Sequence, residues 1–354
     1  MSSIHKNSLI WGGIVSSSPI SKTYSFSTLQ QAGEYFLKQG WTDGLPINLP
    51  TEKEVSKFMD LSGKSNKDII GIEPVKGREI TMEKVAINSV MAGCKPEYFP
   101  IVLTAVEALV ESKFNLHGIT ASTMGAGILT LVTGPIAKEI GLNGGISLFG
   151  PGHQANATIG RALRLVVINC TGSRSGEIDK ATLGHAGKYT WCITENEDFR
   201  PWPNTGEDRG FSKNTNTVSV FAGLSPIQVS NHSSQDPENI LGSFRDALFA
   251  AGPNQGEIVI IFCPEHVQSF KKAGWTKNQI RDFLYEMAVR TNDEWGFGSI
   301  PPGPRPTGSE ITHSALTPES FTLLVGGGAA GAFSCVIPLW AGGVGSQSVT
   351  KELI

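Results

Sequence analysis

The alternation of short apolar runs with longer amphipathic segments constrains the fold of this chain more than any other feature. Four runs have the length and composition of buried strands, at 127–133, 216–222, 257–263 and 321–325. Among the segments with apolar residues at helical spacing, 155–169 is the strongest. Strands that alternate with helices favour sheets flanked by helices. We therefore expect an α/β fold, built as two α/β domains or as one large two-lobed unit.

A polar stretch with two prolines, DFRPWPNTGEDRGFSKNT, offers the best domain boundary. It predicts an α/β domain at 27–205, which carries most candidate site residues, and a second α/β domain at 206–354. Residues 1–26 contain one short apolar run, LIWGGIV. We expect them to form an N-terminal arm that packs poorly on its own domain or reaches a neighbouring subunit, which leaves a homo-oligomer open. The sequence shows no convincing internal repeat.

Charge and composition exclude several classes of partner. Lys plus Arg number 29 and Asp plus Glu 32, with no long run of either sign, which argues against nucleic acid or an anionic membrane surface. No segment reaches the roughly 18 apolar residues of a membrane span. The five cysteines form no CxxC pair, and their odd number leaves at least one free thiol. These features predict a cytoplasmic protein whose partner is a small molecule.

The run Gly-Gly-Gly-Ala-Ala-Gly at 326–331 follows a predicted strand and matches the pattern G-x-G-x-x-G. A dinucleotide site also needs a helix after the glycines and an acidic residue about 20 positions further on. The segment that follows, AFSCVIPLWAGG, is not helical, and position 348 is Ser. A dinucleotide is therefore not expected, and the cofactor stays unknown.

Two arginines on the helix predicted at 155–169 indicate an anion site. Arg161 and Arg164 are three positions apart, so they are neighbours on one helical face. The preceding glycine-rich loop brings His153 to the helix start at Asn156, where free amide groups favour an anion. The alternative is that both arginines pair with structural carboxylates, and the sequence does not separate the two.

Cys94, His117 and His232 are candidates outside that helix. Cys94 lies beside a lysine and just before a helix start, two features that lower a thiol pKa. A small buried side chain is the alternative. His117 falls at the start of a strand predicted at 116–121, where it could act as an acid or base or be a structural residue. His232 lies at another predicted strand end.

The segment GHAGKYTWCITENED collects the most chemical groups. His185 precedes the strand predicted at 188–194, which contains Tyr189. Glu195 and Asn196 follow the strand, at the end where α/β proteins place ligand groups. His, Cys and Glu are also zinc or iron ligands, but their spacing here matches no metal motif. A metal cofactor stays open, and no residue is assigned to one.

A family resemblance rests on long, unusual sequence motifs that are spread over nearly the whole chain: WTDGLP, MAGCKPEY, NATIGRALRL and GHAGKYTWCITEN. They resemble a functionally uncharacterised bacterial family related to UGSC-type (seleno)proteins. The chain has no UGSC or CGSC word, so the resemblance does not imply a selenothiol redox role. Met124 and the segment FSCVIP stand where the family has histidines, which implies a different substrate or reaction if those histidines serve chemistry. The resemblance adds weight to residues inside the shared words: Asp43, Cys94, Glu97, His117, Asn156, Arg161, Arg164, His185, Tyr189, Glu195, Asn196 and His232.

These observations together favour an enzyme, a lyase or hydrolase, that applies acid–base chemistry to a small anionic organic molecule. The catalytic residues are expected around one pocket: Cys94, His117, His185 and Glu195. The substrate-binding residues are expected to be Asn156, Arg161, Arg164, Tyr189, Asn196 and His232. Two alternatives stay open: a redox or nucleophilic enzyme that depends on Cys94, and a non-catalytic protein that binds a small molecule or a metal.

Overall fold

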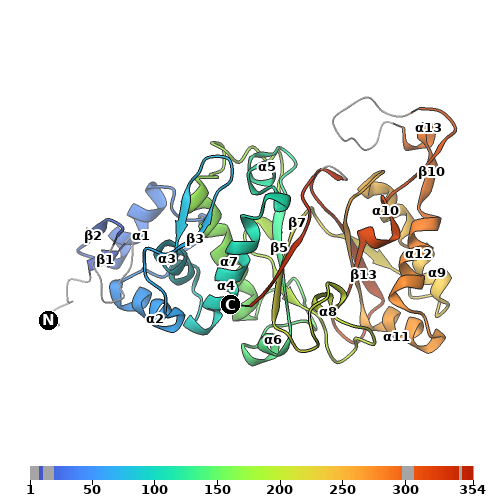
Figure 1. The fold of residues 1–354 in the computed structure, drawn as a ribbon, viewed down its shortest axis with the longest axis horizontal. Coiled ribbons are helices and arrows are strands. Elements are labelled where there is room, and N and C mark those ends of the chain that lie inside the picture. The colour runs from blue at the N-terminus through green and yellow to red at the C-terminus, as the bar shows by residue number, and fades with distance from the viewer. Residues whose placement is uncertain (1–7, 11–19, 297–306, 343–344, 354) are drawn as a thin grey trace.

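The computed structural model describes residues 8–10, 20–296, 307–342 and 345–353 (Figure 1). Its α-helices are α1 (Leu29–Lys38), α2 (Glu52–Ser62), α3 (Met82–Ala92), α4 (Phe99–Leu109), α5 (Leu116–Ala121), α6 (Pro135–Glu139), α7 (Gln154–Val166), α8 (Thr205–Asp208), α9 (Pro237–Gly242), α10 (Arg245–Ala251), α11 (Pro264–Ala273), α12 (Lys277–Met287) and α13 (Asn292–Trp295). Its strands are β1 (Ser8–Ile10), β2 (Thr23–Ser25), β3 (Ile69–Ile72), β4 (Glu79–Thr81), β5 (Gly127–Thr133), β6 (Cys192–Thr194), β7 (Thr217–Gly223), β8 (Ile227–Ser230), β9 (Ile258–Phe262), β10 (Val289–Thr291), β11 (Ile311–His313), β12 (Phe321–Val325), β13 (Phe333–Pro338) and β14 (Val349–Glu352).

Two four-stranded sheets, counted over the described residues, form the centre of the molecule. Sheet 1 has the order β14-β7-β5-β6, and sheet 2 has the order β8-β13-β9-β12. Each sheet contains one parallel pair, β5 with β6 and β9 with β12. The other neighbours are antiparallel. Both sheets therefore share one pattern of strand order and direction.

The two sheets pack face to face, and each carries helices on its outer face, so the molecule has four layers (Figure 1). Leu131 and Phe221 of sheet 1 meet Val259 and Ile261 of sheet 2 in the core between them. Ile260, which alternates with those two, packs in the helical core on the other side of sheet 2. Because these strands are buried on both faces, they appear in the sequence as continuous apolar runs.

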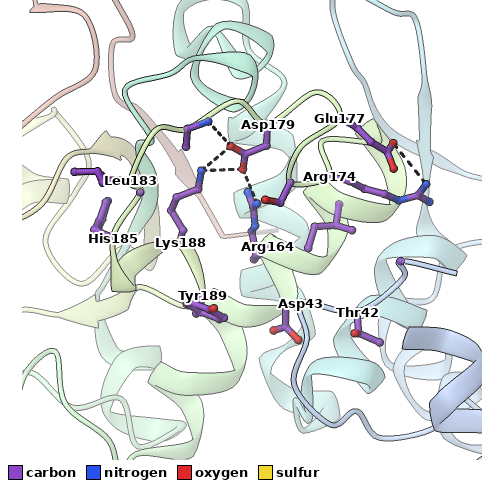
Figure 2. Close-up of a pocket in the computed structure, with 15 residues that line it drawn as sticks. Thr42, Asp43, Arg164, Arg174, Glu177, Asp179, Leu183, His185, Lys188 and Tyr189 are labelled. Atoms are coloured by element: carbon purple, nitrogen blue, oxygen red, sulfur yellow. Dashed lines mark hydrogen bonds and ion pairs between the residues drawn. The ribbon is translucent and has the colours of Figure 1, made fainter. Parts of the chain in front are cut away.

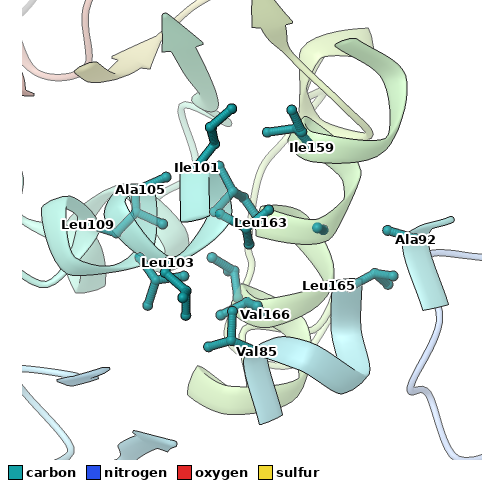
Figure 3. Packing of buried hydrophobic residues seen from close by; sticks show 14 of the residues in the cluster. Val85, Ala92, Ile101, Leu103, Ala105, Leu109, Ile159, Leu163, Leu165 and Val166 are labelled. Atoms are coloured by element: carbon teal, nitrogen blue, oxygen red, sulfur yellow. The ribbon is translucent and has the colours of Figure 1, made fainter. Parts of the chain in front are cut away.

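Helices α3, α4 and α7 build the outer core of sheet 1, where Val85, Leu103, Leu163 and Val166 pack together (Figure 3). Helices α9, α10, α11 and α12 cover sheet 2. The expected α/β fold with sheets flanked by helices is confirmed. Within the described part of the chain, no helix has both the length and the apolar character that crossing a bilayer would need.

The shared sheet pattern is an internal repeat that the sequence did not reveal. In each half, two parallel strands are joined through helices, and the next strand returns antiparallel beside the first of them. The fourth strands are exchanged: β8 follows β7 in the chain but joins sheet 2, whereas β14 follows β13 but joins sheet 1. The chain crosses between sheets where Gly223 pairs with Leu339. The domain limit expected between 205 and 206 therefore runs through sheet 1, because β7 and β14 belong to that sheet.

Three local expectations are corrected. Residues 116–121 form helix α5 instead of a strand, because Asn115 adopts a left-handed conformation and its side chain accepts a hydrogen bond from the amide of Gly118. The strand expected at 188–194 is only three residues long, Cys192–Thr194, and a 3₁₀ turn precedes it. The segment FSCVIP, for which the sequence predicts no element, is β13, one of the two inner strands of sheet 2.

The end of the expected N-terminal arm packs on its own domain. Buried Glu83 of α3 accepts hydrogen bonds from the Ile20 amide at 3.2 Å and the Ser21 hydroxyl at 2.7 Å. The ring of Tyr24 lies 5.3 Å from Tyr35 of α1. Residues 20–25 are thus held on their own domain by these contacts, although none of them is buried, while residues 1–7 and 11–19 lie outside the described residues.

Candidate functional site

Two cavities at opposite ends of β6 are lined by half of the ten candidate residues. The Glu195 cavity, of about 750 Å³, is lined by residues that follow β6, including Glu195 and Asn196. The Asp179 cavity, of about 440 Å³, is lined by residues that precede β6, including Asp179 and His185. Both volumes are in the range of small-molecule sites. The strand separates His185 from Glu195, so the expected single pocket is not formed.

Glu195 is a buried residue at the carboxyl end of β6, and only one of its two carboxyl oxygens accepts hydrogen bonds from described residues. Thr205, the first residue of α8, donates its amide at 2.8 Å and its hydroxyl at 3.0 Å to Oε1. Oε2 is buried and finds no hydrogen-bond partner among the described residues. Burial raises the pKa of Glu195, and the charges of Lys277 and Arg200 oppose this shift only in part. The environment therefore favours the protonated acid.

The walls of the Glu195 cavity come from five segments: the start of α6, the glycine turn at 141–145, His153 before α7, the end of β6 and the polar stretch at 197–214. Asn156 fixes the glycine turn, because its side chain accepts from the amide of Asn143 at 2.9 Å and donates to the carbonyl of the same residue at 3.0 Å. It also donates to the carbonyl of Cys192. Asn156 thus shapes the cavity, and its amide group is engaged by the main chain.

Asn196 ties the two sheets together beside the same cavity. Its main-chain amide donates to the carbonyl of Val325 at 2.8 Å, and its side chain donates to the carbonyl of Gly327 at 2.9 Å. The glycine run at 326–331 connects β12 to β13, so a strand follows it, and the helix that a dinucleotide fingerprint needs is replaced by β13. The run serves as a tight connection in which Gly327 has φ +99°.

The Asp179 cavity is built around one carboxylate that two cations share (Figure 2). Arg164 donates to Oδ2 of Asp179 at 2.8 Å, and Nζ of Lys188 lies 2.9 and 2.8 Å from the two oxygens. Burial alone would raise the pKa of Asp179, but the hydrogen bonds from Lys188 and Arg164 outweigh it and hold this pKa below its ordinary value. Asp179 therefore stays ionised and cannot neutralise both cations.

His185 lines the Asp179 cavity, but both of its ring nitrogens contact main-chain groups. The amide of Gly187 donates to Nδ1 at 3.2 Å, and Nε2 lies 3.1 Å from the carbonyl oxygen of Gly223. This arrangement fits the neutral ring with its proton on Nε2. Burial lowers the pKa of His185, and the charge of Lys188 acts in the same direction. The geometry describes a histidine that joins the loop before β6 to the end of β7.

The two predicted arginines have different partners. Arg161 forms a two-pronged ion pair with buried Asp43, at 2.7 and 2.9 Å, and also donates to the carbonyl of Pro46. It therefore holds the 43–46 turn against α7 and is not part of a joint clamp with Arg164. Tyr189 is 54% exposed on the wall of the Asp179 cavity. His232 lines a third cavity and packs against Phe333.

Cys94 and His117 line neither the Glu195 cavity nor the Asp179 cavity. The thiol of Cys94 contacts the carbonyl of Thr158 at 3.3 Å, and burial raises its pKa to about 12, so a reactive thiolate is not favoured. His117 lies on α5, where Nδ1 is 3.5 Å from Oε1 of Glu73. All five cysteines lie within the described residues and are free thiols, as expected.

Sequence reasoning missed the cavity residues that lie in polar loops. Arg200 and Lys213 belong to the stretch assigned as a domain boundary, and Asp179 lies in a loop without a recognised motif. The two prolines and the charges of that stretch predict a linker, although a charged loop after a strand end is equally typical of a site. Among the described residues, no group of three or more His, Cys, Asp and Glu side chains is arranged to hold a metal ion.

The chain matches no family model, and comparisons with curated proteins and with solved structures give no significant match. The resemblance to the UGSC-related family stays a prediction.

Proposed function

We propose that this protein is an enzyme that applies acid–base chemistry to a small anionic organic molecule in the Glu195 cavity. One observation carries the proposal: Glu195 is a buried carboxyl group with a raised pKa, at a strand end, on the wall of a cavity of about 750 Å³. Burial of this kind raises the pKa of a carboxyl group and favours its protonated form, which can serve as a general acid.

The hydrogen bonds of Glu195 suggest which oxygen carries the proton. Thr205 donates twice to Oε1, so the proton belongs on Oε2. In the proposed step, the side chain turns buried Oε2 toward the cavity, the Oε2–H bond breaks, and the proton passes to an atom of the substrate that gains electron density. The carboxylate that remains is stabilised by Thr205 and by the nearby charges of Lys277 and Arg200.

Two lysines on the cavity wall support an anionic substrate. Lys138 and Lys213 are exposed there, and neither forms an ion pair with another described residue. Arg200 is already engaged by Glu197 at 2.6 Å and by Glu207 at 3.5 Å. The two ammonium groups are therefore free to bind a carboxylate or phosphate on the substrate.

A panel of small carboxylic and phosphorylated acids, incubated with the protein in D₂O and followed by proton NMR, tests this function. The parent should exchange a proton on one panel member or convert it, and Glu195→Gln should lower that rate by about 10²–10⁴-fold, the usual contribution of a general acid. Glu139→Gln, on the exposed end of α6 and outside the cavity lining, is the matched control and should keep the parental rate. Equal rates for the parent and Glu195→Gln would remove Glu195 as the acid.

A further inference from the structure

The Asp179 cavity carries one more positive charge than its carboxylates neutralise. Arg164 and Lys188 are mostly buried, at 15% and 14% side-chain exposure, and both contact the single carboxylate of Asp179. Asp43 offers no compensation, because Arg161 binds both of its oxygens from outside the cavity. His185 adds no charge, since its pKa is lowered. A buried cation without its own counterion is costly, and an anionic ligand would remove that cost.

Arg174 adds a second cation that is only loosely held. Its guanidinium group lies 3.9 Å from Glu177, at the limit of an ion pair, and the Glu177 side chain is 64% exposed. Nε of Arg174 is buried and finds no hydrogen-bond partner among the described residues. Figure 2 shows Arg174 and the Asp179 network on neighbouring walls of the cavity. Arginine can bind a planar carboxylate through two parallel hydrogen bonds.

Besides these cations, the Asp179 cavity is lined by apolar and aromatic side chains. Leu183 is 94% exposed and Tyr189 is 54% exposed, and both line the cavity beside Ile168, which lies in the π-helical segment Val167–Thr171 after α7. A ligand that covers these side chains would gain from burying them. The cavity volume of about 440 Å³ limits the ligand to a small molecule.

We propose that the Asp179 cavity is a second ligand site, which binds a small organic carboxylate that has an apolar or aromatic part. Lys188 and Arg174 bind the carboxylate, while Leu183 and Tyr189 contact the apolar part. The site is separate from the Glu195 cavity and does not depend on the acid–base function proposed there.

Calorimetric titration with phenylacetate, and with its neutral analogue phenylacetamide, tests this site on the full chain. Phenylacetate should bind saturably and phenylacetamide at least about tenfold more weakly, the scale of one charge-assisted hydrogen bond. Lys188→Met and Arg174→Gln should each weaken phenylacetate binding by about tenfold or more. Lys188→Met keeps the Arg164–Asp179 ion pair, so the buried carboxylate retains a partner.

Two control variants distinguish binding in this cavity from binding to surface lysines or in the Glu195 cavity. Lys180→Met removes an exposed lysine of the same loop that does not line the cavity, and it should bind phenylacetate like the parent. Glu195→Gln should also bind like the parent, because it alters the other cavity. Absence of saturable phenylacetate binding, equal binding of phenylacetamide, or parental affinity in both Lys188→Met and Arg174→Gln would overturn the proposal. Loss of phenylacetate binding in Glu195→Gln would instead show that binding depends on the Glu195 cavity, and it would overturn the independence of the two sites.

Discussion

At the scale of single residues, the decisive property is whether a polar side chain is satisfied by the main chain. Asn156 and His185 both lie in the sequence motifs that carry the family resemblance. Both use their polar atoms to hold loops in place. Glu195 differs, because only one of its oxygens is engaged by described residues. A buried group that keeps an unused polar atom is costly for folding, and such costs are concentrated at functional sites.

The raised pKa of Glu195 predicts a pH-dependent stability. A carboxyl group whose folded-state pKa exceeds its unfolded-state value stabilises the folded state below the unfolded-state pKa, and this contribution is lost as the pH rises through the folded-state pKa. We expect Glu195→Gln, which cannot ionise, to gain stability relative to the parent as the pH rises from acid to neutral. Urea unfolding of both proteins at several pH values measures this trend, and a constant difference would contradict the raised pKa.

At the scale of helices and strands, local signals place most elements and their ends. Helix α12 begins with a capping box, which is a local sequence signal: the Thr276 hydroxyl accepts from the amide of Gln279, and the Gln279 side chain accepts from the amide of Thr276. The strand expected around His117 is wrong because one left-handed asparagine, Asn115, starts a helix there. Such a conformation depends on neighbours that a hydrophobic pattern does not include.

The Thr276 cap should contribute measurably to the stability of the second half. Thr276→Ala leaves an amide at the start of α12 without its partner and should cost about 1 kcal/mol of unfolding free energy. Glu286→Ala, at an exposed position of the same helix, should change it by less than about 0.5 kcal/mol. Chemical denaturation of the two variants measures both values. A loss as small for Thr276→Ala as for Glu286→Ala would show that the cap contributes little.

At the scale of the whole molecule, the exchanged strands link the two halves of the chain. The last described strand, β14, pairs with β7, and the hydroxyl groups of Thr350 and Ser219 lie 2.7 Å apart across that pair. In return, β8 forms the edge of sheet 2 beside β13. Each sheet is thus completed by a strand from the other half of the chain.

Removing the final strand should therefore weaken the sheet that is distant in sequence. A chain that ends at Gly342 should lose hydrogen-exchange protection in β7, more than a hundred residues away, and more strongly than in β9 of sheet 2. Lys351→Ala, which removes only an exposed ion pair with Glu111, should keep the protection of β7. Equal protection of β7 in the truncated and full chains would show that sheet 1 is stable without β14.

The positions of most helices and strands could be predicted from the sequence alone, because periodicity and capping are local. The apolar runs at 127–133 and 321–325 coincide with β5 and β12. Glu195 and Asn196 are recognisable as site candidates in the sequence because they follow a strand.

The tertiary structure alone decided which strands pair and which loops meet. Strand pairing is set by backbone hydrogen bonds and by packing between residues far apart in the chain, so neither the repeat nor the exchange of β8 and β14 leaves a local signal. The same reason applies to the cavities. Asp179, Lys188 and Arg164 lie on a loop, a turn and a helix, and only folding brings two cations onto one carboxylate.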